Sequence, residues 1–191
     1  ARKNLKAITM AEIEEATIKV VVGTEKKSHV MTEKEKTLTA YHEGGHAVVT
    51  YYCPTQDPVH QISIIPRGMA GGYTMQLPTE DRAYKCKKEM QEDLVVLLGG
   101  RVAEALVLDD ISTGASNDIE RATKTARAMV TKYGMSERLG TVTYGTDNSE
   151  PFLGRDMGHI RDYSETTASA IDHEIKSILS DAYKKTESIL S

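Results

Sequence analysis

The sequence predicts a mainly α-helical domain with one small β-hairpin, and three observations predict this fold class. Two segments begin with a capping box, a threonine followed three residues later by a glutamate. Two short β-like segments are bounded by Gly and Pro residues, which is typical of a hairpin. One helical segment carries the HExxH motif of zinc peptidases.

The first two helices are predicted from their capping boxes. Residues 9–12 (TMAE) open a helix that ends at Gly23, because glycine is a common helix stop. Residues 24–28 are polar and read as a linker. Residues 32–35 (TEKE) open a second helix, which runs to about Tyr52, where a Cys-Pro pair ends it.

The hairpin and a long helix follow. Residues 59–65 and 72–77 are β-like and are separated by a Pro- and Gly-containing tip. From residue 79 to residue 108 the apolar positions recur with helical spacing. The Gly99-Gly100 pair inside this segment indicates a break or a point of close packing.

The last third of the chain predicts a turn, a helix, an irregular segment and a final helix. The turn covers residues 112–116, and the helix runs from about 117 to 133. Residues 135–158 are Gly-rich and irregular, with a short strand at 141–144. The final helix spans about 160–190.

Composition excludes several classes of protein. The net charge is −4 and the pI about 5.9, so a strongly basic nucleic-acid surface is not expected. The longest apolar run, residues 94–100, is far shorter than the roughly 20 residues of a membrane-spanning helix. Cys53 and Cys86 fit no disulfide framework and no Cys-based zinc motif, so we expect free thiols of a reducing compartment. Because the first residue is Ala1, we expect a piece of a longer protein.

His42-Glu43-Gly44-Gly45-His46 is an HExxH motif inside the second predicted helix. Residues four apart share one helical face, so both imidazoles can bind one metal ion. Glu43 then lies beside the open coordination position, where it can exchange protons with a water molecule and with the leaving amine. Two glycines inside a helix cost about 1 kcal/mol each relative to alanine, which indicates a close approach by another group.

A catalytic zinc site needs a third protein ligand. The cysteines have no ligand spacing, and the extended HExxHxxGxxH signature is absent. The remaining candidates are carboxylates: Glu92, Glu104, Asp109, Asp110 and Asp118. Glu104 lies in a helical segment, and Asp118 lies in the first turn of a helix, where the helix dipole favours a carboxylate. Spacing alone favours Asp118 over Glu104 only slightly.

Several segments together resemble the FtsH-type ATP-dependent zinc metalloproteases, which are membrane-anchored AAA+ proteases. They follow the order and spacing of that family over nearly the whole chain. These segments are residues 33–36 (EKEK), 40–47 (AYHEGGHA), 63–68 (SIIPRG), 98–104 (LGGRVAE), 112–119 (STGASNDI) and 133–136 (YGMS).

The resemblance implies a role for each residue of the motif. It implies that His42 and His46 bind one Zn²⁺ per chain, that Asp118 is the third ligand, and that Glu43 is the catalytic acid/base. Glu104 then becomes a candidate to hold a ligand histidine by a hydrogen bond. The sequence departs from the family at Gly44, where alanine is more usual, and at Leu108-Asp109-Asp110, which replaces a glycine-containing turn.

The resemblance also implies an architecture. Residues 1–30 are expected to be the end of the AAA+ lid helix and a linker, and residues 31–191 the zinc metallopeptidase domain. ATP and Mg²⁺ would act only through an ATPase domain outside this chain, and membrane anchoring through further segments outside it. The family works as a homo-hexamer on unfolded or membrane-extracted proteins. The implied location is the cytoplasmic face of the bacterial inner membrane, with an organellar membrane as the alternative.

The hairpin suggests how a polypeptide substrate is held. An extended peptide can add to an exposed strand edge by backbone pairing, and the candidates for that strand are Gly71, Gly72, Tyr73 and Thr74. The alternative is that the hairpin only packs. Two other functions stay open: a catalytically silent assembly module of a ring, and a zinc hydrolase that cuts a different amide.

Overall fold

The computed structural model describes residues 7–26, 30–68, 70–145 and 163–191. Its elements in chain order are α1 (Met10–Val21), α2 (Glu33–Tyr52), β1 (Val59–Ser63), β2 (Tyr73–Gln76), α3 (Lys87–Leu108), the 3-10 helix η1 (Thr113–Ala115), α4 (Ser116–Thr131) and α5 (Glu165–Leu190). The prediction of a mainly α-helical chain with one small hairpin is confirmed. None of the helices among the described residues combines the length and the apolar character needed to cross a membrane.

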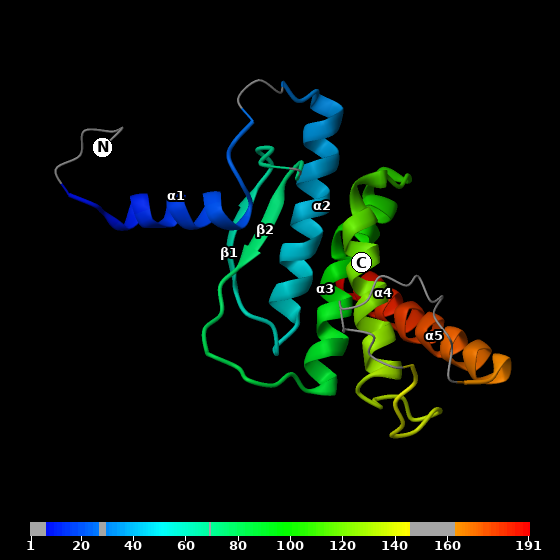
Figure 1. The fold of residues 1–191 in the computed structure, drawn as a ribbon. Coiled ribbons are helices and arrows are strands. Elements are labelled where there is room, and N and C mark those ends of the chain that lie inside the picture. Colours follow the sequence, from blue (N-terminus) through cyan, green and yellow to red (C-terminus); the bar gives the residue numbers. More distant parts are fainter. Residues whose placement is uncertain (1–6, 27–29, 69, 146–162) are drawn as a thin grey trace, which may run out of the picture.

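Helix α2 lies between the hairpin and the other long helices. Figure 1 shows β1 and β2 on one side of α2, and α3 with α4 on the other, while α5 crosses behind them. The two strands are antiparallel, with Ser63 opposite Tyr73 and Ile62 opposite Thr74. The HExxH helix is therefore covered on both sides, by a strand pair and by a helical layer.

The main core lies where α3 meets α4 and α5. Leu94, Met129 and Ile171, one from each of these helices, are almost completely buried. The buried hydroxyl of Thr186 on α5 donates to the backbone oxygen of Val95 on α3, at 3.0 Å. This core holds α3 and α4 in fixed positions against α2.

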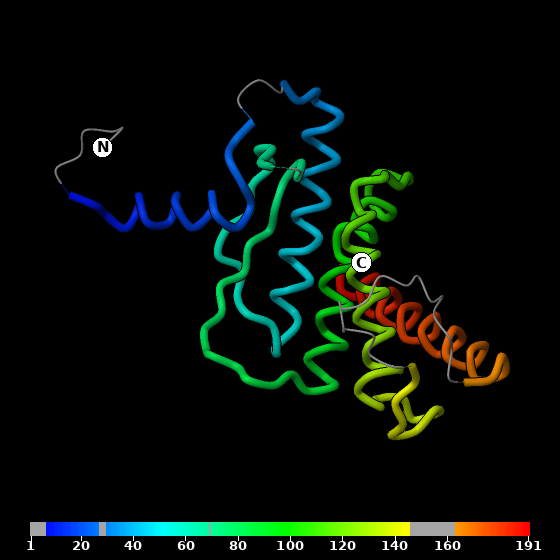
Figure 2. Tube along the Cα trace, in the orientation of Figure 1, coloured from blue at the N-terminus to red at the C-terminus, as the bar shows by residue number. Residues whose placement is uncertain are grey.

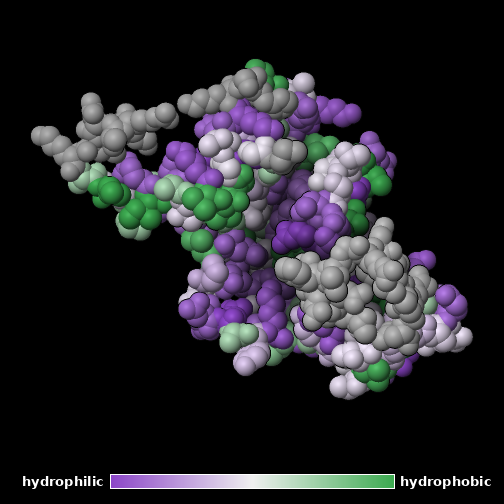
Figure 3. All heavy atoms as spheres, in the orientation of Figure 1, coloured by the Kyte–Doolittle hydropathy of each residue, from purple (hydrophilic) through white to green (hydrophobic). Residues whose placement is uncertain are grey.

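Helix α1 extends away from the rest of the molecule, as Figure 2 shows. It is held at its C-terminal end, where Ile18 packs in a small cluster with Tyr73 and Met75 of β2. Several of its other apolar side chains are exposed, and Figure 3 shows them as green patches over α1. Among them are Met10, Ile13 and Val20.

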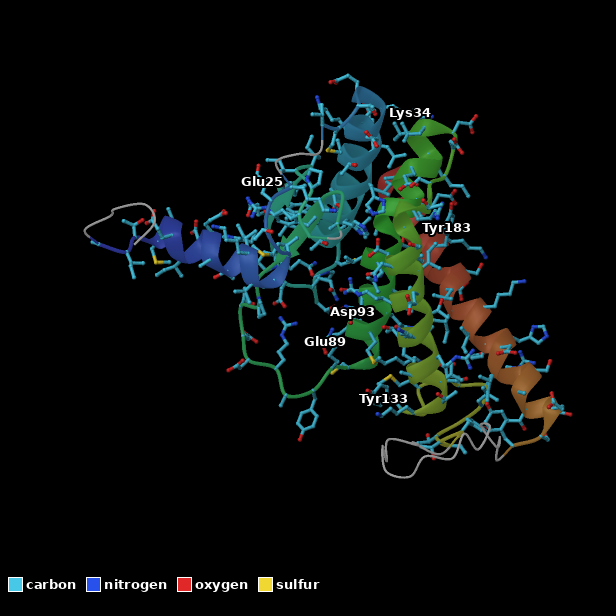
Figure 4. All side chains as sticks on the ribbon, turned by 45° about the horizontal axis from the view of Figure 1, so that its top comes forward. Glu25, Lys34, Glu89, Asp93, Tyr133 and Tyr183 are labelled. Carbon is cyan, nitrogen blue, oxygen red and sulfur yellow. The ribbon has the colours of Figure 1, made fainter. Side chains whose placement is uncertain are left out.

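Backbone hydrogen bonds join the segment after α1 to the loop between β1 and β2. The amide of Lys26 donates to Pro66 O at 3.0 Å, and the amide of Gly68 donates to Thr24 O at 3.2 Å. The buried Arg67 lies 3.5 Å from Glu15 of α1, measured from Nη1 to Oε1. Figure 4 shows Glu25 of the same segment beside the hairpin.

Helix α3 begins at Lys87, so the prediction of a helical start at residue 79 is wrong. The amide of the N-cap residue Cys86 donates a hydrogen bond to Glu89 Oε2, three residues later, at 2.6 Å. Such a contact is typical of a helix N-terminus. Residues 79–86 form a loop in which Arg82 pairs with Asp57 (3.3 Å) and with Glu89 (3.4 Å). Figure 4 shows Glu89 and Asp93 on the first turns of α3, near this loop.

Three further predictions concern Gly99-Gly100, residues 141–144 and the start of the last helix. The Gly99-Gly100 pair does not interrupt α3, so close packing is the correct interpretation. Residues 141–144 do not form a strand, and Tyr144 instead donates its amide to Thr131 O at 2.9 Å. Helix α5 begins at Glu165, after an N-cap contact from Ser164, whereas the expected start near residue 160 lies outside the described residues.

Candidate metal centre

The two histidines of the HExxH motif lie one turn apart on α2 and face the same side. Thr32 begins this helix, because its hydroxyl accepts a hydrogen bond from Glu35 N at 3.2 Å and the Glu35 carboxylate accepts one from Thr32 N at 2.7 Å. Further along this helix, the Nε2 atoms of His42 and His46 lie 3.1 Å apart. Both side chains are largely buried.

Asp118 brings a carboxylate to these imidazoles from a different helix. Its Oδ2 lies 3.3 Å from His42 Nε2 and 3.4 Å from His46 Nε2. It stands in the first turn of α4, directly after the η1 turn, which Ser112 stabilises by accepting the amide of Gly114 at 3.0 Å. The three residues offer metal-ligating atoms that all lie within 4.8 Å of one another.

This donor set fits a catalytic zinc ion. Two imidazole nitrogens and one carboxylate oxygen are a usual set of protein ligands for catalytic zinc, and three ligands leave the fourth position for water or substrate. The pKa of Asp118 fits as well. Burial opposes its charge, but hydrogen bonds from His42 and His46 outweigh burial and hold the pKa of Asp118 well below its usual range. The carboxylate is therefore charged at neutral pH.

Each histidine has a hydrogen-bond partner on its other ring nitrogen. His42 Nδ1 lies 2.7 Å from Glu104 Oε1, and His46 Nδ1 lies 2.8 Å from the backbone oxygen of Val96. Because both partners are acceptors, each Nδ1 is suited to carry a hydrogen, and each Nε2 can offer its lone pair when a metal ion takes the place of a proton there. Burial disfavours the His42 imidazolium, but hydrogen bonds to Asp118 and Glu104 favour it more strongly. The pKa of His42 is therefore raised.

Glu104 connects two parts of the site. It is fully buried on α3, and its second oxygen, Oε2, accepts the amide of Ser112 at 2.8 Å. One carboxylate thus orients a ligand histidine and fixes the turn that precedes Asp118. Glu104 is accordingly placed against His42 Nδ1 and not among the atoms that could share a metal ion.

The other carboxylates considered from the sequence lie elsewhere. Glu92 is buried, but it accepts hydrogen bonds from the amide (2.9 Å) and hydroxyl (2.6 Å) of Thr55. Asp109 and Asp110 are exposed at the end of α3, where Asp109 adopts a left-handed conformation with φ 49°. Sequence spacing alone could not show which of these carboxylates lies near the histidines, because that depends on how α3 and α4 pack.

Glycines allow α2 and α3 to approach closely at the site. A Cβ atom on Gly100 would lie 2.4 Å from Cε1 of His42, and one on Gly45 would lie 2.5 Å from the backbone oxygen of Gly99. Both distances are too short for any side chain. The imidazole of His42 therefore occupies the space that a residue larger than glycine at position 100 would fill.

Glu43 is buried beside the histidines and contacts β2. Its Oε2 accepts a hydrogen bond from the hydroxyl of Thr74 at 2.8 Å. Burial raises the pKa of Glu43, and the Thr74 hydrogen bond and the two histidines offset this only in part. The sequence offered Thr74 only as a residue of a substrate strand, and no spacing rule connects it to Glu43.

A cleft of about 830 Å³ opens over these residues. Its walls include all four candidates for the substrate strand, Gly71, Gly72, Tyr73 and Thr74. Gly71 is exposed, Gly72 and Tyr73 are buried, and Thr74 is half-buried. Arg121 also lines the cleft, and its Nη1 lies 3.9 Å from Asp118 Oδ1. No motif in the sequence points to Arg121.

Comparison with known proteins places this chain in one family. Residues 29–191 match the sequence profile of peptidase family M41. The chain is 63% identical over 190 residues to the ATP-dependent zinc metalloprotease FtsH 1 of Thermoanaerobacter sp. (strain X514). It is 61% identical over 190 residues to the ATP-dependent zinc metalloprotease FtsH of Caldicellulosiruptor bescii, and 60% identical over 191 residues to FtsH 2 of Alkaliphilus metalliredigens.

These matches cover 100% of this chain but only part of each relative. The matched share is 31% of the Thermoanaerobacter and Caldicellulosiruptor proteins and 28% of the Alkaliphilus protein. The chain therefore spans less than a third of the length of the curated relatives that it matches.

Proposed function

We propose that this chain, which belongs to peptidase family M41, hydrolyses internal peptide bonds of unfolded polypeptides at one zinc ion per chain. The observation that carries the proposal is the meeting of His42, His46 and Asp118 beside Glu43 in one cleft. The names of the relatives, which are zinc metalloproteases, support zinc as the metal and polypeptides as the substrates.

We assign the ligand role to His42, His46 and Asp118, through the two Nε2 atoms and the Asp118 carboxylate. A bound zinc ion would polarise the scissile carbonyl and lower the pKa of a water molecule to about 7. Glu104 and the backbone oxygen of Val96 hold the imidazoles in the tautomer that leaves Nε2 free.

Glu43 is the proton carrier of the proposed reaction. Its carboxylate takes a proton from the water that attacks the scissile carbonyl carbon. When the C–N bond breaks, it gives this proton to the nitrogen of the leaving amine, so that the chain ends the reaction in its starting protonation state. Its side chain is largely buried, which limits its contact with bulk water.

We propose that the peptide lies along β2. Within the described residues β2 pairs with β1 alone, so its other edge has no strand partner. Gly71 to Thr74 line the cleft beside the metal cluster, where an added strand would bring a carbonyl near Glu43. Backbone pairing makes few demands on side chains, which suits a protease of broad sequence preference.

The remaining parts of the proposal concern the whole protein. We propose that residues 1–30 are the end of an ATPase lid and a linker, and that residues 31–191 are the peptidase domain. ATP dependence appears in the names of the relatives. For this chain we propose ATP hydrolysis by a domain outside it, assembly as a homo-hexamer, and anchoring at the cytoplasmic face of a bacterial membrane.

Glu43→Gln tests the proposed function. The amide keeps the size of the side chain but cannot accept the proton, so cleavage of an unfolded protein such as casein should fall by about 100-fold or more. Zinc content should stay at the parent level, because Glu43 is not among the ligands. Glu33→Gln makes the same change at an exposed site on the same helix, and its activity should equal that of the parent.

The result also separates the alternatives. Full zinc occupancy without cleavage of any polypeptide by the parent would favour an assembly module or a hydrolase of another amide, which a panel of non-peptide amides would distinguish. Equal cleavage by parent and Glu43→Gln would contradict the role of Glu43.

A further inference from the structure

Strand β2 contacts the side chain of Glu43 at two points. The hydroxyl of Thr74 lies 2.8 Å from Glu43 Oε2, at the end of the side chain. Near the middle of the side chain, a Cβ atom on Gly72 would lie 3.0 Å from Glu43 Cγ, so the strand backbone passes very close to it. The carboxylate is thus bounded by one strand as well as by its own helix.

The position of Thr74 is itself fixed by the packing of β2. The residues on either side, Tyr73 and Met75, are buried on the opposite face of the strand, in the cluster with Ile18. Thr74 stands opposite Ile62 in the register of the hairpin. Two residues further on, Gln76 Nε2 donates to Thr50 Oγ1 of α2 at 3.0 Å. The hydroxyl of Thr74 therefore has little freedom to leave Glu43.

The chemistry of the contact favours the carboxylate as the acceptor. A threonine hydroxyl has one hydrogen to donate, and two oxygens of Glu43 are within reach: the carboxylate Oε2 at 2.8 Å and the backbone oxygen at 3.0 Å. An ionised carboxylate is the stronger acceptor of the two. The branched side chain of threonine is also stiff about χ1, so the donor is held in one direction.

We infer that Thr74 is a positioning residue for Glu43. Its hydroxyl holds the carboxylate at the edge of the His42–His46–Asp118 cluster. A glutamate side chain has three rotatable bonds, and a proton carrier works only when its oxygen stays within hydrogen-bond reach of both the water and the leaving nitrogen. The inference rests on the proposed function, because it assigns Thr74 a part in the same reaction.

This role differs from the contact with substrate that the sequence suggested for Thr74. The backbone of β2 would still pair with a peptide, while the Thr74 side chain faces Glu43. One strand would then align both the scissile bond and the group that carries the proton. Loss of the hydroxyl should consequently reduce kcat and leave KM nearly unchanged.

Thr74→Val and Thr74→Ser test the inference in the protein with zinc bound, on a fluorogenic unfolded polypeptide. Valine keeps the shape and removes the donor, so kcat should fall by about 10- to 100-fold, the range seen when a supporting hydrogen bond is lost at a metal site. Serine keeps the donor and should restore most of kcat. Thr74→Ala also lacks the donor and should match valine, which decides the question if the valine variant fails to fold.

Thr55→Val is the matched control. Its hydroxyl also donates to a buried glutamate, Glu92, but outside the cleft. It should keep the parent kcat. Crystals of Thr74→Val should show the Glu43 carboxylate displaced and the His42, His46 and Asp118 side chains unmoved, a result that does not depend on activity.

Several results would overturn the inference. An unchanged kcat in the valine and alanine variants would do so, as would a change confined to KM, or a serine variant as slow as valine. These results leave the proposed function intact as long as the parent cleaves and Glu43→Gln does not. If the parent with zinc bound does not cleave, the proposed function fails, and the inference fails with it.

Discussion

Gly44 and Gly45 are neighbours in the sequence and stand in opposite environments. A Cβ atom on Gly44 would have no atom within 4 Å beyond its own helix and chain neighbours. A Cβ atom on Gly45 would lie 2.5 Å from Gly99 O and 2.6 Å from Ala103 Cβ. Only the second glycine is required by the packing of α2 on α3, although the sequence pattern treats both alike.

Alanine substitution should separate the two glycines. Gly44→Ala should stabilise the fold by about 0.5–1 kcal/mol, because alanine restricts the unfolded chain and fits the helix without a clash. Gly45→Ala should destabilise it by about 1–3 kcal/mol, because α2 and α3 must move apart. Urea unfolding of both variants and the parent measures these changes. Equal midpoints for the two variants would contradict the observed packing.

At this scale the sequence predicted some residues of the site and missed others. The helical spacing of His42 and His46 is a local property, so the motif alone was sufficient to predict that they converge. Asp118 and Glu104 were nearly equivalent on spacing, and only the fold separates the carboxylate beside both Nε2 atoms from the one beside Nδ1. The contact of Thr74 with Glu43 joins a strand to a helix and has no local signal.

At the scale of elements, helix starts were predicted well where a capping box precedes an apolar repeat, as at Thr9 and Thr32. The prediction failed at the start of α3 because the N-cap there is Cys86, a residue without a usual capping side chain. The loop before it is held by tertiary ion pairs of Arg82. Segment 141–144 has the composition of a strand but no neighbouring strand to pair with among the described residues.

The attachment of α1 gives a prediction about an element. Ile18, which is 5% exposed, is the buried side chain of α1 and packs on Tyr73 and Met75. Ile18→Ala should remove about 2 kcal/mol or more of local stabilisation. Hydrogen exchange of the α1 amides should become faster, while exchange in α3 and α4 stays at the parent rate. Val20→Ala, at a position that is 85% exposed, is the control and should leave α1 unchanged. Equal exchange in both variants would show that Ile18 does not anchor the helix.

At the scale of the whole molecule, zinc should couple stability to pH. A ligand that binds only the folded chain raises the melting temperature by mass action. Zinc needs the neutral form of His42, whose pKa is raised, so protons compete with zinc as the pH falls through that pKa. In the absence of zinc, the stability of the fold depends on pH with the opposite sign. The raised pKa of His42 then stabilises the fold below the unfolded value of 6.5, and this stabilisation is lost as pH rises through the folded pKa.

The zinc-induced increase in melting temperature should therefore be large near pH 8 and should shrink toward about pH 5. Thermal unfolding with zinc and with a chelator, over this range, measures the increase. An increase of equal size at both ends of the range would be inconsistent with histidine ligation.

The proposed zinc site is tested most directly by the zinc content per chain, measured by elemental analysis on the parent, Asp118→Ala and Asp110→Ala side by side. Asp110 is an exposed acid close in sequence to the site and serves as the control. We expect about one zinc in the parent and in Asp110→Ala, because three protein ligands hold a catalytic ion, and a clear loss in Asp118→Ala. Full occupancy in Asp118→Ala, or no zinc in the supplemented parent, would contradict the proposed site.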